Sequence, residues 1–316
     1  MSWHKALLAF LIPNAVIALA PSAATNGAAR EGLVGRWDLT VQKPGGNVPS
    51  WLELRSSGRI ALVGRFVGEV GSARPVARVD LGRDAHIRFA IPAQWETGDG
   101  DLRFEGRLDG TRLTGSLTYP DGTRFPFTGV RAPSLRREGE PRWGDPVRLI
   151  ASDGLSGWRV LGGESRWRVA DGVLHNAGSG GNLVSEHAFG DFKLHVEFRY
   201  PKGSNSGVYL RGRYEVQIAD SIPAQPVNDL LGSVYGFLAP SEVVQAKPNE
   251  WQTYDITLVG RMLTVVANGK TVICNQEIPG PTGGALDSNE GAPGPLMLQG
   301  DHGVIEYRNI VLTPAR

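Results

Sequence analysis

One segment of the chain carries polar side chains of the kind that bind sugars. Apolar and polar residues alternate over 214–219, so Glu215 and Gln217 share one face of a predicted strand. Asp220 lies just past the end of that strand, and Arg211 directly follows an apolar strand. A carboxylate, an amide and a guanidinium in one groove offer paired hydrogen bonds to a hydroxyl-rich ligand. We therefore expect these four side chains to reach one ligand-binding surface.

A second polar group follows an apolar strand near the C-terminus. Gln299, Asp301 and His302 come directly after residues 296–298, at a glycine-bounded turn. His302 is the only one of the six histidines beside a carboxylate in such a turn. The ordinary pKa of a histidine is close to neutrality, so His302 could act as a general acid or base. The alternative is a turn histidine that bonds a neighbouring backbone group.

The residues around these groups predict an all-β protein. Residues 30–131 read as a β-meander of roughly eight short strands, which forms a small barrel or sandwich. Residues 132–146 are rich in charge and proline and predict a linker. In 147–316 strand follows strand, and residues 192–200 alternate cleanly between apolar and polar. This second region predicts a two-sheet jelly roll.

Composition limits the classes of partner. The chain has 316 residues, of which 41% are hydrophobic and 21% are charged, so it can bury a sizeable core. Its 33 basic and 32 acidic residues give a formal net charge of +1, which indicates no nucleic acid or anionic membrane as a partner. Cys274 is the only cysteine, so no intramolecular disulfide can form. Because it ends an apolar run, we expect Cys274 to be buried.

The N-terminus predicts an export signal rather than a membrane span. His4 and Lys5 precede an apolar run over 6–20, which is shorter than the ~20 residues needed to cross a bilayer. Small residues favour cleavage after Ala24. We therefore expect a signal peptide over 1–24 and an exported protein, either periplasmic or extracellular.

The order of motifs in the second region resembles a known family. The motifs are those over 154–158, 167–174, 190–199, 205–220, 250–256, 268–269 and 298–310. Together they resemble the 3-keto-disaccharide hydrolase domain family, formerly domain of unknown function 1080, over about residues 147–314. Residues 150–153 depart from this pattern, because the family commonly has an Asn-Gly-Lys-like turn there. The resemblance implies a concanavalin/laminin-G-like jelly roll and exported enzymes that cleave 3-keto-glycosides.

The chemistry implied by this resemblance differs from that of ordinary glycosidases. A carbonyl at C3 of a sugar acidifies the proton on C2, so a base can remove it and form an enediolate. The substituent on C1 then leaves by elimination, and water adds to the enone. Such a site needs a base, an acid for the leaving oxygen, and a donor or cation for the enediolate. It does not need the carboxylate nucleophile of a retaining glycosidase.

The resemblance also suggests roles for single residues. Glu215 is the first candidate for a base or a metal ligand, and His302 for an acid or a base. Glu215, Asp220 and Asp301 are oxygen donors that could together hold a divalent cation such as Ca²⁺. The residues expected to bind or orient an oligosaccharide or glycoside substrate are Arg211, Gln217, Asp220, Tyr235, Gln299 and Asp301.

Three other functions are compatible with a jelly roll. One is a non-catalytic laminin-G-like carbohydrate-binding module. Another is a retaining glucanase, but Gln217 stands where the second catalytic carboxylate of that class is expected. The third is a purely structural exported protein. Clustering of Glu215, Gln217 and His302 on one concave face would argue against this third function.

Overall fold

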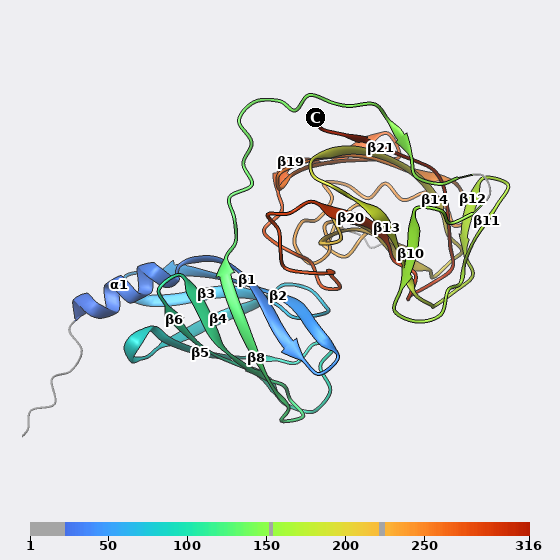
Figure 1. Ribbon diagram of the computed structural model, residues 1–316. Helices are drawn as coiled ribbons and strands as arrows, with labels where there is room; N and C mark the ends of the chain where they lie inside the picture. Colours follow the sequence, from blue (N-terminus) through green and yellow to red (C-terminus); the bar gives the residue numbers. More distant parts are fainter. Residues whose placement is uncertain (1–22, 152–153, 221–224) are drawn as a thin grey trace, which may run out of the picture.

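The computed structural model describes residues 23–151, 154–220 and 225–316, and almost all of their regular structure is β (Figure 1). One α-helix, α1 (Ala23–Leu33), and one short 3-10 helix (Arg83–Ala85) occur in this part of the chain. The prediction of an all-β protein is confirmed. The predicted export signal lies outside the described residues except for Ala23 and Ala24, which begin α1. Within the described ranges, no helix is long and apolar enough to cross a membrane.

The first region is a closed barrel of eight antiparallel strands. Each strand pairs with the next in sequence, and β8 pairs with β1 to close the barrel. Such a meander matches the roughly eight short strands that the sequence predicts. The strands are β1 (Gly35–Lys43), β2 (Gly46–Ser57), β3 (Ala61–Val67), β4 (Arg74–Leu81), β5 (His86–Pro92), β6 (Asp101–Asp109), β7 (Arg112–Thr118) and β8 (Arg124–Arg131).

The interior of the barrel is filled by aromatic and aliphatic side chains. Phe89 and Phe104 stack with ring centroids 4.6 Å apart, and both are buried. Leu33 at the end of α1 joins this core, and its carbonyl accepts a 2.9 Å hydrogen bond from Trp37 Nε1. The helix is thereby held against the barrel. The barrel interior is therefore a packed core, so ligand sites must lie on its loops and outer surface.

The second region consists of two β-sheets. The order of strands is β10-β13-β20-β15-β16 in the five-stranded sheet and β11-β12-β21-β14-β17-β18-β19 in the other, with β9 paired to β21. The strands of the smaller sheet are β10 (Trp158–Leu161), β13 (Asn182–Phe189), β15 (Asn205–Leu210), β16 (Tyr214–Ala219) and β20 (Gly294–Leu298). Those of the larger sheet are β9 (Val147–Arg148), β11 (Trp167–Ala170), β12 (Val173–Asn176), β14 (Phe192–Arg199), β17 (Gln252–Val259), β18 (Met262–Ala267), β19 (Lys270–Glu277) and β21 (Ile305–Pro314).

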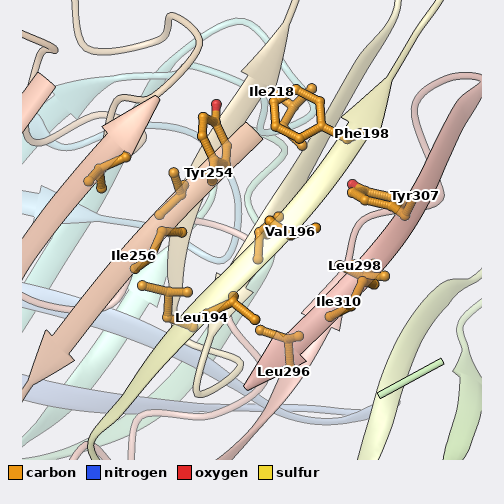
Figure 2. Packing of buried hydrophobic residues seen from close by; sticks show 14 of the residues in the cluster. Leu194, Val196, Phe198, Ile218, Tyr254, Ile256, Leu296, Leu298, Tyr307 and Ile310 are labelled. Atoms are coloured by element: carbon orange, nitrogen blue, oxygen red, sulfur yellow. The ribbon is translucent and has the colours of Figure 1, made fainter. Parts of the chain in front are cut away.

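The two sheets share one hydrophobic core, as in a β-sandwich. Figure 2 shows Leu194, Val196 and Phe198 of β14 gathered with residues of the neighbouring strands and of the opposite sheet. These side chains are the buried members of the alternating run that the sequence predicts. Cys274 is exposed rather than buried, because β19 is an edge strand with an irregular register beside it. The expectation for Cys274 is therefore wrong.

The barrel is joined to the sandwich by a buried polar cluster. Arg261 of the sandwich donates two hydrogen bonds, of 2.9 and 2.6 Å, to the carboxylate of Glu290. Asp38 of β1 lies against this pair, and burial raises the pKa of its carboxyl far above the ordinary value, with further help from Glu290. Burial also acts to raise the pKa of Glu290, but the bonds from Arg261 outweigh it and lower that pKa. Asp38 therefore keeps its proton at neutral pH, and only one charged carboxylate faces Arg261.

Apolar contacts extend this join along the side of the barrel. Trp51 of β2 packs edge-to-face on Phe237, with ring centroids 5.4 Å apart. Gly280 lies against the Trp51 indole so closely that a Cβ there would overlap the ring. Between β8 and β9 the segment 132–146 contains no helix or strand beyond an isolated bridge at Trp143. These contacts set the position of the barrel loops relative to the polar face of β16.

Candidate active site

A cavity of about 450 Å³ lies where the polar face of the smaller sheet meets the barrel. Members of both groups of candidate residues reach it. Glu215 and Gln217 come from β16, and Gln299, Asp301 and His302 come from the turn after β20. The cavity is lined by Val70, Gly71, Trp95, Asn205, Tyr209, Glu215, Gln217, Tyr235, Gly283, Gly284, Gln299, Asp301 and His302. Glu215 and His302 therefore face one pocket although they are far apart in the sequence.

The two faces of β16 divide as the alternation predicts. Tyr214, Val216 and Ile218 belong to the hydrophobic core of the sandwich. Glu215 and Gln217 point to the opposite side and line the cavity. Both are also largely buried, because loops of the sandwich and of the barrel cover this face. The strand thus places an acidic side chain at the floor of a pocket rather than on an open surface.

Glu215 is a buried carboxyl with an unusual pKa. Burial raises its pKa to about 8, although the hydrogen bond from Tyr209 and the charge of His302 act in the opposite direction. Tyr209 Oη lies 2.9 Å from Glu215 Oε2 and 3.0 Å from the carbonyl oxygen of Gly283, to which it can also donate. At pH 7 most Glu215 side chains therefore carry a proton.

A glycine on the neighbouring strand makes room for this carboxyl. A Cβ at Gly207 of β15 would collide with the Glu215 side chain. The Asn-Ser-Gly run at 205–207 therefore needs glycine at its third position. A side chain at that position would push Glu215 away from the hydroxyl of Tyr209.

Asp301 and His302 form a hydrogen-bonded pair at the rim of the pocket. Asp301 Oδ1 lies 2.6 Å from His302 Nδ1, and both side chains are about half exposed. The hydrogen bond with the Asp301 carboxylate raises the pKa of His302 above its ordinary value of 6.5. When Nδ1 donates to Asp301, the neutral ring keeps its free electron pair on Nε2. A histidine ring oriented by a carboxylate is also the arrangement of the general base in known catalytic triads.

The remaining walls of the pocket offer hydrogen bonds to a polar ligand. Gln217 Oε1 accepts a 3.1 Å bond from the amide of Ile218, which leaves Nε2 to donate. Tyr235 contributes a phenol, and burial raises the pKa of that phenol. Oε1 of Gln299 and Oδ1 of Asn205 are buried and have no hydrogen-bond partner among the described residues. Unsatisfied buried acceptors in a pocket are suited to the hydroxyl donors of a sugar.

Two residues predicted to bind substrate are placed elsewhere. The Arg211 side chain is buried, and its Nη2 donates to the carbonyl of Gly260 at 2.8 Å and to the Tyr214 hydroxyl at 3.1 Å. Its position in the turn after β15, with a φ of 52°, directs it away from the pocket. The Asp220 carboxylate accepts a 2.7 Å bond from Gln245 Nε2 and does not line the cavity. The expectation that Arg211 and Asp220 reach the pocket is wrong.

The carboxylates do not gather as a metal site would require. The sequence suggests Glu215, Asp220 and Asp301 as joint ligands of a divalent cation, but only Glu215 and Asp301 line the pocket. Over the residues that the structure describes, no cluster of three or more His, Cys, Asp or Glu side chains could hold a metal ion. The residues present therefore do not fit the cation site that the sequence suggests.

Several residues of the pocket were not identified from the sequence. Tyr209, which bonds Glu215, is its direct cross-strand partner in the β15–β16 hairpin. The short turn at 211–213 fixes that register, so counting outward from the turn could have identified Tyr209. Val70 and Trp95 come from the barrel, and no periodicity in the sequence indicates that the barrel reaches this pocket.

Comparisons with known proteins find a family match over the second region of the chain. Residues 146–313 match the sequence model of the family described as 3-keto-alpha-glucoside-1,2-lyase-like domain. A 3-keto-disaccharide hydrolase of Bacteroides thetaiotaomicron is 33% identical over 101 residues, which are 28% of this chain and 33% of the relative. The chain thus spans about a third of the length of that relative.

Two solved structures of Parabacteroides distasonis proteins described as glycosyl hydrolases are also similar. The first is 29% identical with a TM-score of 0.44, and the match covers 53% of this chain and 83% of the other. The second is 25% identical with a TM-score of 0.42, covering 54% and 98%. The sequence match over residues 146–313 shows that the protein belongs to the 3-keto-alpha-glucoside-1,2-lyase-like domain family.

Proposed function

We propose that this protein is an exported enzyme that cleaves 3-keto-glycosides, including 3-keto-disaccharides. The proposal rests on the pocket that holds a protonated carboxyl, Glu215, and an oriented imidazole, His302. Export to the periplasm or the exterior is supported by the signal-like residues 1–24. The family and the hydrolase name of the curated relative support a carbohydrate substrate, and the two sheets around one core support a concanavalin-like jelly roll.

The reaction begins with removal of the C2 proton. The neutral His302 ring accepts this proton on Nε2, while Asp301 holds the ring and balances the charge of the imidazolium. The electron pair of the C–H bond moves to the C3 carbonyl oxygen and forms an enediolate. Tyr235 and Gln217 offer an O–H and an N–H to the pocket, and these donors stabilise the developing negative charge.

The second step breaks the glycosidic bond. The enediolate reforms the carbonyl and expels the oxygen on C1, which receives a proton from Glu215. A carboxyl with a pKa of about 8 is protonated at neutral pH, so it is in the state that this step needs. Water then adds to C1 of the enone and C2 regains a proton, which yields the 3-keto sugar. The net reaction is hydrolysis.

A comparison of two substrates tests the proposed function. We expect the enzyme to cleave a 3-keto-disaccharide and to leave the unoxidised parent disaccharide intact, because only the keto sugar has an acidic C2 proton. Product sugars from each substrate would be measured by chromatography. Cleavage of the parent at a similar rate would indicate an ordinary glycosidase and contradict the proposal.

The second candidate function is a carbohydrate-binding module without catalysis. The unsatisfied acceptors of Gln299 and Asn205 favour sugar binding whether or not a reaction follows. In the same comparison, binding of the 3-keto-disaccharide without cleavage would support this function and contradict the enzyme.

A further inference from the structure

The barrel closes one side of the candidate active site. Val70 and Gly71, in the loop after β3, and Trp95, in the loop after β5, line the same cavity as Glu215. The family match covers only residues 146–313, so these three residues lie outside the family domain. The barrel therefore supplies a wall of the pocket that the domain alone does not have.

Trp95 is an exposed aromatic side chain on a fixed loop. Its side chain is 68% exposed, although it is among the largest in the protein. The adjacent Glu96 makes hydrogen bonds of 3.1 and 2.6 Å with Arg74, and both side chains of this pair are about nine-tenths buried. Glu96 also accepts a bond from the amide of Trp95 itself. The loop is thus anchored directly beside the exposed indole.

A second pair of hydrogen bonds connects the Trp95 loop to the loop after β3. Gln94 Nε2 donates to Ser72 Oγ at 2.8 Å, and the amide of Ser72 donates to Gln94 Oε1 at 3.0 Å. A Cβ at Gly71 would collide with both Gln94 and Trp95, so only glycine fits under the indole. The backbone that carries the indole is thus fixed by several contacts, so little freedom of the loop remains to be lost when a ligand binds.

The loops after β3 and β5 are held against the sandwich by further contacts. The amide of Gly284 donates a 2.8 Å bond to the carbonyl of Glu69, and a Cβ at Gly283 would collide with the backbone of Gly71. Tyr209, the partner of Glu215, bonds the carbonyl of that same Gly283. A continuous set of contacts therefore fixes Trp95 relative to the Glu215 carboxyl.

Trp95 also borders a second cavity of about 360 Å³ on the barrel. Lys43, Tyr119 and Phe125 line this cavity together with Trp95. A ligand that leaves the space between Glu215 and His302 on this side must pass the indole. In the proposed function the 3-keto sugar lies between these two residues, so a group attached to it would extend past the indole.

From this arrangement we infer that Trp95 is a platform on which the leaving group of the substrate stacks. The inference rests on the proposed function. Pyranose and aryl rings have apolar faces that pack on an indole, whereas a methyl group offers little area for such packing. The barrel would thus select 3-keto-glycosides whose leaving group carries a ring, such as disaccharides.

A change of selectivity tests the platform. We expect Trp95→Ala to lower the ratio of kcat/KM for a 3-keto-disaccharide to that for the methyl 3-keto-glycoside by about tenfold, mainly through KM. Trp95→Phe should restore most of the ratio, because it keeps an aromatic face. Ile60→Ala is the control, since Ile60 is 88% exposed on the barrel and lines neither cavity. An unchanged ratio in Trp95→Ala would overturn the inference.

A binding measurement separates this inference from the proposed function. If the wild-type protein cleaves neither keto sugar, the proposed function fails, and calorimetric titration with the same two sugars then decides the role of Trp95. About tenfold weaker binding of the disaccharide by Trp95→Ala, with a smaller change for the methyl glycoside, supports the platform. Equal binding of the disaccharide by both proteins overturns it.

Discussion

His302→Ala lowers kcat/KM at least about a hundredfold on every 3-keto-glycoside, whatever its leaving group, because it removes the base that takes the C2 proton. The ring is oriented by the 2.6 Å bond to Asp301 and faces the same pocket as Glu215. No other histidine lines that pocket among the described residues. Initial rates on a 3-keto-disaccharide and on a 3-keto 4-nitrophenyl glycoside would measure the loss.

His187→Ala is the matched control for this prediction. His187 is an exposed histidine of the smaller sheet that lies outside the pocket, so its replacement should leave both rates unchanged. Imidazole added to His302→Ala should restore part of the activity, because a small base can enter the space left by the ring. Wild-type rates in His302→Ala would contradict the proposed base.

Glu215→Gln distinguishes the role of the acid from that of the base. We expect at least about a hundredfold loss on a 3-keto-disaccharide, whose sugar alkoxide needs a proton as it leaves. The loss should be much smaller on the 4-nitrophenyl glycoside, because 4-nitrophenolate is stable without a proton. A loss of equal size on both substrates would show that Glu215 is not the acid. Glu186→Gln, which changes an exposed carboxylate outside the pocket, is the control.

The pH dependence of the rate, measured for the wild type and for Glu215→Gln, is a further test of Glu215 as the acid. The wild-type rate on the disaccharide should fall as the pH rises through about 8, where Glu215 loses its proton. It should also fall on the acid side as His302 becomes protonated, and hydrogen bonding to Asp301 places that limb above pH 6.5. Glu215→Gln has no proton to lose, so its rate should not show the alkaline limb.

Measurements of thermal stability show whether a variant with a lower rate is still folded. The folded state raises the pKa of Glu215 from 4.5 to about 8, so between these values the folded protein holds a proton that the unfolded chain releases. The contribution of Glu215 to the free energy of unfolding is therefore fully present below pH 4.5, and it is lost as the pH rises through 8. Glu215→Gln avoids this loss and should melt no lower than the wild type at pH 8.

Strand periodicity predicts much of this structure because a half-buried strand has only two faces. The alternation over 214–219 correctly assigns Glu215 and Gln217 to one face and the core residues to the other. The turn that follows residues 296–298 correctly predicts a polar group with His302. Within β16 the local pattern determines the direction of each side chain, whereas for the turn it predicts only that polar residues gather there.

The direction of turn residues was not predictable in this way. Arg211 lies in a turn with a positive φ, so its side chain does not continue the alternation of β15 and instead enters the core side. Asp220 lies past the end of β16 and is held by Gln245 rather than facing the pocket. Periodicity applies within a strand and gives no direction to residues outside it.

The sequence patterns also did not predict that the barrel contributes to the pocket. Trp95 lies in a polar loop more than 100 positions before Glu215, and only the docking of the two regions brings them to one cavity. That docking depends on contacts such as Trp51 with Phe237 and Asp38 with Glu290 and Arg261. Each of these residues looks like an ordinary core or surface residue when its own segment is considered alone.

The fate of the hydrogen on C2 tests the central claim that the protein removes the C2 proton of a 3-keto sugar in order to break the bond at C1. A 3-keto-disaccharide that carries deuterium on C2 would be turned over in ordinary water, with the product analysed by mass spectrometry after a short reaction. We predict a slower rate for the deuterated substrate and a product that has lost the label, while the product sugar incubated without enzyme keeps it over the same time. Cleavage at an unchanged rate, with deuterium fully retained on C2, would contradict the elimination mechanism.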